Sequence, residues 1–119
     1  MTPVLLDLER KQETLFIRLR GELDLGAAEH LRNALEQALD REPVRNLVIN
    51  LAGVSFIDSS GLGVLLGRYK RVSKNGGKVM LVSPQPQVRR ILELSGLFRI
   101  MDELSSESEA LVKPVREGL

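Results

Sequence analysis

The chain has 119 residues, the length of one ordinary domain, and contains no cysteine, which excludes disulfides, thiolate metal sites and cysteine nucleophiles. Its 17 basic and 16 acidic residues are interspersed and give a net charge of +1, without the basic block typical of nucleic-acid binders. No apolar run approaches the roughly 20 residues that cross a bilayer, and the N-terminus lacks the pattern of a signal peptide. We therefore expect one domain over residues 1–119, cytoplasmic and monomeric, that contacts neither nucleic acid nor membrane directly.

The first part of the chain predicts a β-hairpin followed by a helix. Residues 4–9 form a short apolar run, and residues 14–20 alternate in the manner of a half-buried strand. The polar stretch between them fits a hairpin turn. From residue 27 to residue 39 the apolar side chains recur every three or four positions, which indicates an amphipathic helix. Asp24 lies just before this helix, where a cap or first-turn acid is expected.

A strand, a helix and a second strand are predicted next. Residues 45–51 are apolar enough to form a strand buried on both faces, and residues 78–83 are predicted to form another. A helix that ends near Ser73 connects them, and short loops make the three elements a right-handed parallel crossover. The densest basic stretch of the chain, GRYKRVSK, is interpreted as the solvated face of this helix.

The last third of the chain predicts two further helices. Ser83 and Pro84 begin the first of them and Gly96 ends it, after which LFRIM adds a short edge strand. A capping-box pattern then predicts a last short helix that extends to Pro114. The complete order describes an α/β fold, with a mixed sheet of four to five strands packed with four helices.

The stretch FIDSSGLG, residues 56–63, contains more polar residues than the start of a helix needs. Asp58, Ser59 and Ser60 are all good N-cap residues, because each can accept a hydrogen bond from an unpaired amide of the first turn. One cap is sufficient, so two of these polar side chains are left without a structural reason.

Two glycines follow in the first turn of the same predicted helix. Gly61 and Gly63 each lower helix stability by up to about 1 kcal/mol relative to alanine, and glycine is useful where another backbone must approach closely. A buried parallel strand that leads into a helix is also where open α/β sheets place their sites. We therefore interpret residues 58–63 as a functional surface, and we expect both glycines to be replaceable without loss of the fold.

Few chemical roles fit this surface. The nucleophile-elbow pattern and both common phosphate-binding loops are absent, and the single histidine, His30, lies in the first predicted helix. We therefore expect no enzymatic activity, no cofactor and no metal ion. A serine at a helix N-terminus is well placed to carry a phosphate group, because free amides and the helix dipole favour an anion. A small hydrolase that uses Ser59, or a module that binds a nucleotide or another small molecule, remain alternatives.

Three motifs occur in the order GELD, FIDSSGLG and LSGLF, and together they resemble the STAS-domain anti-sigma factor antagonists. The resemblance runs from about residue 15 to residue 101 and is closest to the sporulation members of that family. Those members oppose the anti-sigma factor that inhibits the first forespore-specific sigma factor. The resemblance implies a single STAS domain, whose fold agrees with the elements predicted above.

The resemblance also implies a function and a site. Ser59 would be phosphorylated by the anti-sigma factor itself, a serine kinase that uses ATP, and dephosphorylated by a PP2C-type phosphatase. The unphosphorylated form would bind the anti-sigma factor and so release the sporulation sigma factor. The partner-binding residues of the family map onto the following positions: Asp24, Asp58, Ser59, Ser60, Gly61, Leu62 and Gly63.

One short segment departs from the family pattern. Sporulation members carry polar residues just after GELD, where this chain has Leu25, Gly26 and Ala27. The departure concerns the detailed contacts of this loop and leaves the implied role of Ser59 unchanged. A general-stress or other partner-switching pathway, with a different kinase as partner, is the alternative function.

Overall fold

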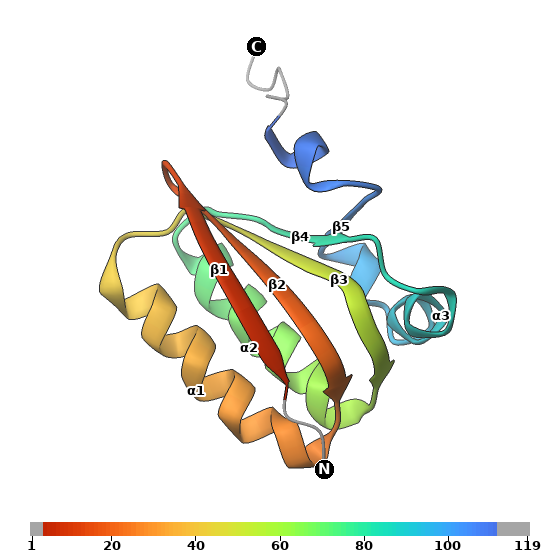
Figure 1. The fold of residues 1–119 in the computed structure, drawn as a ribbon. Helices are drawn as coiled ribbons and strands as arrows, with labels where there is room; N and C mark the ends of the chain where they lie inside the picture. The colour runs from red at the N-terminus through yellow and green to blue at the C-terminus, as the bar shows by residue number, and fades with distance from the viewer. Residues whose placement is uncertain (1–3, 112–119) are drawn as a thin grey trace.

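The computed structural model describes residues 4–111, which form a five-stranded mixed sheet with α1 and α2 packed on one face (Figure 1). The strand order in the sheet is the order in the chain, β1-β2-β3-β4-β5. The elements have these bounds: β1 Leu5–Lys11, β2 Thr14–Leu23, α1 Leu25–Arg41, β3 Asn46–Ile57, α2 Ser59–Lys74, β4 Val79–Val82, α3 Pro86–Leu94, the 3₁₀ helix η1 Leu97–Arg99, β5 Asp102–Leu104 and the 3₁₀ helix η2 Glu107–Leu111. The predicted α/β class and mixed sheet are confirmed.

Strand pairing follows the predicted connections. β1 and β2 pair antiparallel, with Asp7 opposite Arg18, and the hairpin between them contains Gln12 at a φ of 56°. β2 pairs with β3 in parallel, and so do β3 with β4 and β4 with β5. The β3–α2–β4 unit is therefore the predicted crossover. The parallel pairing of β2 with β3 makes these two strands end at the same edge of the sheet.

The main hydrophobic core lies between the sheet and the two long helices. The helical period places Leu31 and Leu35 of α1 and Leu65 of α2 on the faces that contact the sheet, where each has no exposed surface. Ile49 of the central strand is equally buried between them. Each such side chain contributes about 1.5–3 kcal/mol by leaving water, so this layer fixes both helices on the sheet.

Among the element boundaries that differ from the prediction are the end of β3 and the start of α3. β3 runs on to Ile57 instead of ending at Leu51, because it continues along β2 through an irregular register. Gly53 permits this continuation, since an ideal Cβ at that position would lie 2.8 Å from Arg20 Cγ. α3 begins at Pro86, later than predicted, with this proline in its first turn, where a missing N–H costs nothing.

The C-terminal part corrects the predicted number of helices. Residues 4–111 contain three α-helices, and the expected fourth is the 3₁₀ helix η2, while its predicted extension to Pro114 lies outside the described residues. LFRIM does not form the edge strand, because Leu97–Arg99 is helical, and the strand β5 follows it at Asp102–Leu104. The left-handed Gly96, at a φ of 86°, starts this turn and sets where the strand can begin.

The sequence predicts that the GRYKRVSK stretch forms a solvated helix face. The structure differs at one residue of this stretch, Arg68. Arg68 is only 7% exposed and lies between α1 and α2, with its Nε 2.9 Å from Glu36 Oε2. The contact is an ion pair without an in-line hydrogen bond, and burial lowers the pKa of Arg68 while the charge of Glu36 opposes this. Arg71 binds Glu36 and Asp40 of the same α1 helix, so charges join the two helices.

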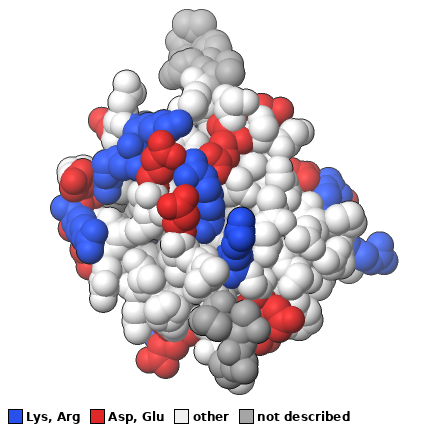
Figure 2. All heavy atoms as spheres, viewed as in Figure 1, with Lys and Arg blue, Asp and Glu red and all other residues white. Residues whose placement is uncertain are grey.

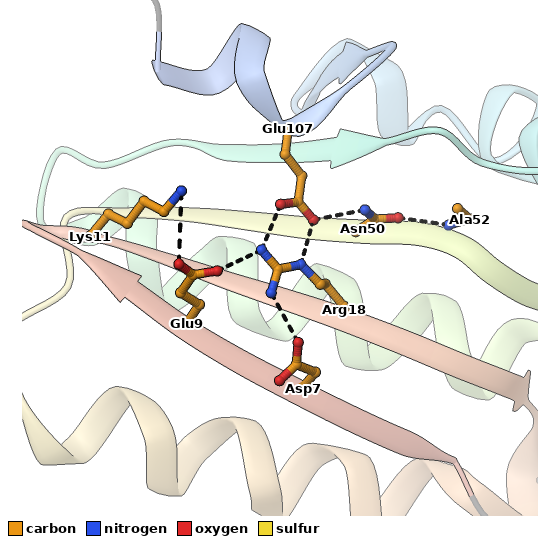
Figure 3. A network of polar contacts seen from close by, with 7 residues as sticks. All are labelled: Asp7, Glu9, Lys11, Arg18, Asn50, Ala52 and Glu107. Atoms are coloured by element: carbon orange, nitrogen blue, oxygen red, sulfur yellow. Dashed lines mark hydrogen bonds and ion pairs between the residues drawn. The ribbon is translucent and has the colours of Figure 1, made fainter.

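The other face of the sheet is covered differently. Among the described residues it carries no α-helix, and its apolar cluster of Phe16, Val48 and Val82 is covered by the C-terminal segment. Charged side chains of both signs gather over the hairpin end of β1 and β2 on this face (Figure 2). Their centre is Arg18, which donates hydrogen bonds to carboxylates from β1 and from η2 (Figure 3). The bond from Arg18 is the main cause of a lowered pKa of Glu107.

Glu107 should make the fold sensitive to acid. Because its pKa is lower in the folded protein, ionised Glu107 stabilises the fold above the ordinary glutamate pKa of about 4.3, and this contribution is lost as the pH falls through the lowered value. We expect the free energy of unfolding of Glu107→Gln to fall less than that of the wild type between about pH 6 and about pH 3. Urea unfolding at both pH values measures the two falls, and equal falls would contradict the prediction.

Candidate functional site

The N-termini of α1 and α2 lie next to each other at one edge of the sheet. β2 and β3 are parallel neighbours, with Leu23 paired to Ile57, and each strand leads through one aspartate into its helix. The residues before these helices, Asp24 and Asp58, therefore reach the same place. Two segments distant in the sequence, GELD and FIDSSGLG, thus form one surface.

Asp58 binds both helices. Its Oδ1 accepts hydrogen bonds from the N–H groups of Ser60 at 2.8 Å and Gly61 at 3.1 Å, which makes it the N-cap of α2. Its Oδ2 accepts a hydrogen bond from the N–H of Leu25, the first residue of α1, at 3.2 Å. One carboxylate thus satisfies amides at the positive ends of two helix dipoles and holds the helix ends together.

Asp24 is the cap of α1. Its Oδ1 accepts a hydrogen bond from the N–H of Ala27 at 3.0 Å. Beyond the two caps, the first turns of α1 and α2 contain no acidic residue. The surface made by these two turns is therefore neutral in its side chains, and both aspartates at its border are engaged in capping.

The two serines are free of the capping role. Ser59 is the first residue of α2 and is exposed, while Ser60 is half-buried. Within the described part of the chain, neither hydroxyl takes part in a hydrogen bond, because Asp58 already accepts from the amides that a serine cap would serve. The Ser59 hydroxyl is thus presented to solvent on a rigid helix end.

The two glycines of the motif differ. Gly61 is buried, and an ideal Cβ there would lie 2.3 Å from the carbonyl oxygen of Leu23 and 2.9 Å from Ile57 Cγ1. The expectation that Gly61 could be replaced without disturbing the fold is therefore wrong, because its missing side chain lets α2 pack against the end of β2. Gly63 is exposed with nothing within 4 Å of an ideal Cβ, as expected of a replaceable position.

Exposed apolar residues near this surface were missed by the sequence reasoning. Leu25 is 75% exposed at the first position of α1, and Phe56, two residues before Asp58, is 44% exposed. Leu62 is partly buried and packs against the main core. The signal that could have found Leu25 was its place outside the apolar repeat of the helix, since a leucine there does not belong to the buried face of α1. We call Leu25, Asp58, Ser59, Leu62 and Gly63 the Ser59 surface.

The Ser59 surface is suited to docking more than to enclosing a small molecule. Two open depressions of about 520 and 700 Å³ lie elsewhere, and Ser59 lines neither. Residues 4–111 contain no cluster of histidine and acidic side chains that could hold a metal ion, and no helix there is long and apolar enough to cross a membrane. His30 is an exposed residue of α1. What remains is a serine hydroxyl that another protein can reach.

Comparison with known proteins agrees with the motifs. The family model of the STAS domain matches residues 6–111, which is most of the chain. The chain belongs to the STAS domain family. Two curated relatives of this STAS protein carry names that include a partner. An anti-sigma F factor antagonist from Paenibacillus polymyxa is 38% identical over 108 residues, which cover 91% of this chain and 92% of that protein. An anti-sigma-B factor antagonist from Bacillus subtilis (strain 168) is 34% identical over 111 residues, covering 90% and 95%.

Solved structures extend the similarity to three dimensions. The unphosphorylated form of the anti-sigma factor antagonist SpoIIAA matches this STAS protein with a TM-score of 0.78 and 37% identity, over 90% of this chain and 93% of that one. The phosphorylated form of Bacillus SpoIIAA matches with a TM-score of 0.71 and 36% identity, over 90% and 96%. The STAS protein thus groups with anti-sigma factor antagonists in sequence and in fold.

Alanine substitutions should separate the two glycines. Gly61→Ala forces the new methyl group into the backbone of β2, so we expect a loss of about 1–3 kcal/mol in the free energy of unfolding. Gly63→Ala meets no atom and should stabilise α2 by up to about 1 kcal/mol. Urea unfolding followed by circular dichroism measures both, and similar stability of the two variants would contradict the close packing at Gly61.

Proposed function

We propose that this STAS protein is an anti-sigma factor antagonist that binds its anti-sigma factor through the Ser59 surface. The anti-sigma factor is also the serine kinase that phosphorylates Ser59, and phosphorylation ends the binding. One observation carries the proposal: Asp58 caps α2 and binds the first amide of α1, so the exposed hydroxyl of Ser59 is left without a structural role. The named relatives and the two described states of SpoIIAA support it.

The position of Ser59 suits a switch that works by local charge. A phosphate group adds about −1.5 to −2 charges at neutral pH. It would lie beside the Asp58 carboxylate, in the centre of a surface whose first-turn side chains are otherwise uncharged. A helix N-terminus tolerates an anion, so the domain can carry the phosphate without a rearrangement of α2.

The phosphate charge destabilises the complex with the partner. Burying the phosphate against a partner, or desolvating it incompletely, costs several kcal/mol. Because each 1.4 kcal/mol changes an affinity tenfold, a cost of about 3–4 kcal/mol is enough to turn a tight complex into a negligible one. Removal of the phosphate by a PP2C-type phosphatase would restore binding and complete the cycle.

We assign the sporulation pathway as the first candidate, with release of a sporulation sigma factor as the outcome. The F-type relative is 38% identical to this chain, against 34% for the B-type relative, and three quoted motifs point the same way. The second candidate is a general-stress pathway, which the B-type relative favours. The genes beside the one for this protein distinguish the two, because the sporulation antagonist is expected next to its anti-sigma factor and sigma factor.

Phosphorylation by the partner tests the central claim. When the protein is mixed with the anti-sigma factor encoded beside it and ATP, mass spectrometry should place one phosphate on Ser59. Ser59→Ala should accept no phosphate and should still bind, because Asp58 continues to cap α2. Ser60→Ala is the matched control and should be phosphorylated as the wild type is. Phosphorylation of Ser59→Ala at the wild-type rate would assign the acceptor elsewhere, and a Ser59→Asp variant that binds normally would remove charge as the switch.

The exposed leucine of the Ser59 surface gives an independent test of where the partner binds. Leu25→Ser removes an apolar side chain that is 75% exposed, so it should leave the stability unchanged but weaken binding by about tenfold or more. Leu94→Ser in α3 is the matched control, since Leu94 is also 75% exposed, and it should bind as the wild type does. Calorimetric titration with the anti-sigma factor measures both, and equal affinities would exclude Leu25 from the interface.

A further inference from the structure

The C-terminal segment, residues 105–111, lies across the sheet face that α1 and α2 leave open. We call this segment the strap. It consists of the end of a loop and the 3₁₀ helix η2, which packs over β3 and β5. It contributes to the cover over Phe16, Val48 and Val82, which have 1% or less of their surface exposed. The strap is therefore part of the cover over the second apolar cluster of the protein.

The Glu107 side chain of the strap binds polar side chains of β2 and β3 (Figure 3). Its Oε2 accepts from Arg18 Nε at 2.8 Å, and its Oε1 accepts from an Arg18 terminal nitrogen at 2.8 Å. Asn50 Nδ2 donates to the same Oε2 at 2.7 Å. Arg18 is itself held by Asp7 at 2.9 Å and Glu9 at 2.7 Å, so the receptor for Glu107 is already ordered on β1 and β2.

The apolar contacts of the strap are small by comparison. Within the strap, Ala110 packs on the second apolar cluster. Leu104 also packs on this cluster but belongs to β5. Leu111 is 51% exposed. A 3₁₀ helix also has poorer hydrogen-bond geometry than an α-helix. A segment with few buried apolar contacts and partly exposed polar contacts opens at a lower free energy than the whole fold.

The N-terminal end of the strap is attached to the sheet by hydrogen bonds. Ser83, the residue after β4, has a φ of 52°, donates its N–H to the carbonyl of Leu104 and donates its hydroxyl to the carbonyl of Ser105. These bonds hold the chain at the junction of β5 and the strap, at Leu104 and at the first strap residue, Ser105. The last residue of β5 thus stays attached to the sheet whether or not Glu107 is bound.

We propose that the strap opens as a unit while the rest of the domain stays folded, and that Glu107 bound to Arg18 and Asn50 is the clasp that closes it. Opening uncovers the apolar face around Val48 beside the Arg18 receptor. A segment that replaced the strap there would have to bring a carboxylate for Arg18 and a small apolar side chain one helical turn later, as Glu107 and Ala110 do. This device is independent of the proposed role of Ser59, which lies on another surface.

Thiol labelling tests the strap cleanly because the chain has no cysteine of its own. Val48 and Ile49 are adjacent in β3, both have no exposed surface, and they point to opposite faces of the sheet. We expect Val48→Cys to react with a thiol reagent at least about tenfold faster than Ile49→Cys. The labelling rate of Val48→Cys should change little with low urea. The labelling rate of Ile49→Cys should rise steeply with urea concentration, because exposure of its thiol requires global unfolding.

The clasp is tested by adding Glu107→Gln to each cysteine variant. The labelling rate of Val48→Cys should rise by about ten- to a hundredfold, because hydrogen bonds to charged groups are lost. The rate of Ile49→Cys should rise no more than the measured loss of global stability requires. Glu109→Gln is the matched control, since this carboxylate accepts a hydrogen bond from the N–H of Ser105 within the strap, and it should accelerate the labelling of Val48→Cys much less.

Three results would overturn the proposal. Equal rates with equal urea dependence in the two cysteine variants would mean that the strap opens only when the domain unfolds. No acceleration by Glu107→Gln, or the same acceleration by Glu109→Gln, would mean that Glu107 is not the clasp. If Val48→Cys does not fold by circular dichroism, Val82→Cys and Leu81→Cys in β4 form an equivalent pair on opposite faces, with 1% and 0% of the native side chains' surfaces exposed.

Discussion

The bridge made by the Asp58 carboxylate is the contact on which the proposed site depends. Its two oxygens bind amides of α2 and the first amide of α1, and so fix two helix ends relative to each other. The bridge can form because β2 and β3 are parallel neighbours and end at the same edge, so that both following helices start there. Gly61 completes the arrangement, since its missing side chain brings the first turn of α2 against Leu23 at the end of β2.

The chemistry of the surface follows from this bridge. Because Asp58 serves as the cap, Ser59 is exposed on a helix end whose position is fixed by contacts other than its own. A group added to its hydroxyl can therefore change what the surface binds without changing how the domain folds. The partial positive charge of two helix ends and the negative charge of two capping aspartates meet at this place. A phosphate group would shift that local balance towards repulsion of an acidic partner, and its desolvation would oppose the docking of an apolar one.

The two faces of the sheet are closed by different physical means. On one face, long amphipathic helices bury residues such as Leu31 and Leu65 completely, and a buried Arg68 is paired with Glu36 between them. On the other face, a short segment with little apolar surface is held by the ionic contact of Glu107 with Arg18. The burial of many apolar side chains resists local opening. A partly solvated ion pair contributes less free energy than this burial does, and salt weakens it. The core under α1 and α2 is therefore expected to open only at a higher free energy than the strap on the opposite face of the sheet.

The sequence by itself determined the α/β class, the hairpin and the crossover, because each depends on a local period, and it predicted the position of the site from a motif of adjacent residues. The family followed from the same motifs. Sequence periodicity did not reveal that Asp58 reaches Leu25, that Gly61 is needed for packing, or that Arg68 is buried, since each of these depends on a residue far away in the chain. The weak C-terminal helix signal became a 3₁₀ turn whose position is set by Glu107 and its distant partners. Local patterns specify elements and their order, while the contacts between helix ends, and between the strap and the sheet, exist only once the sheet has brought these segments together.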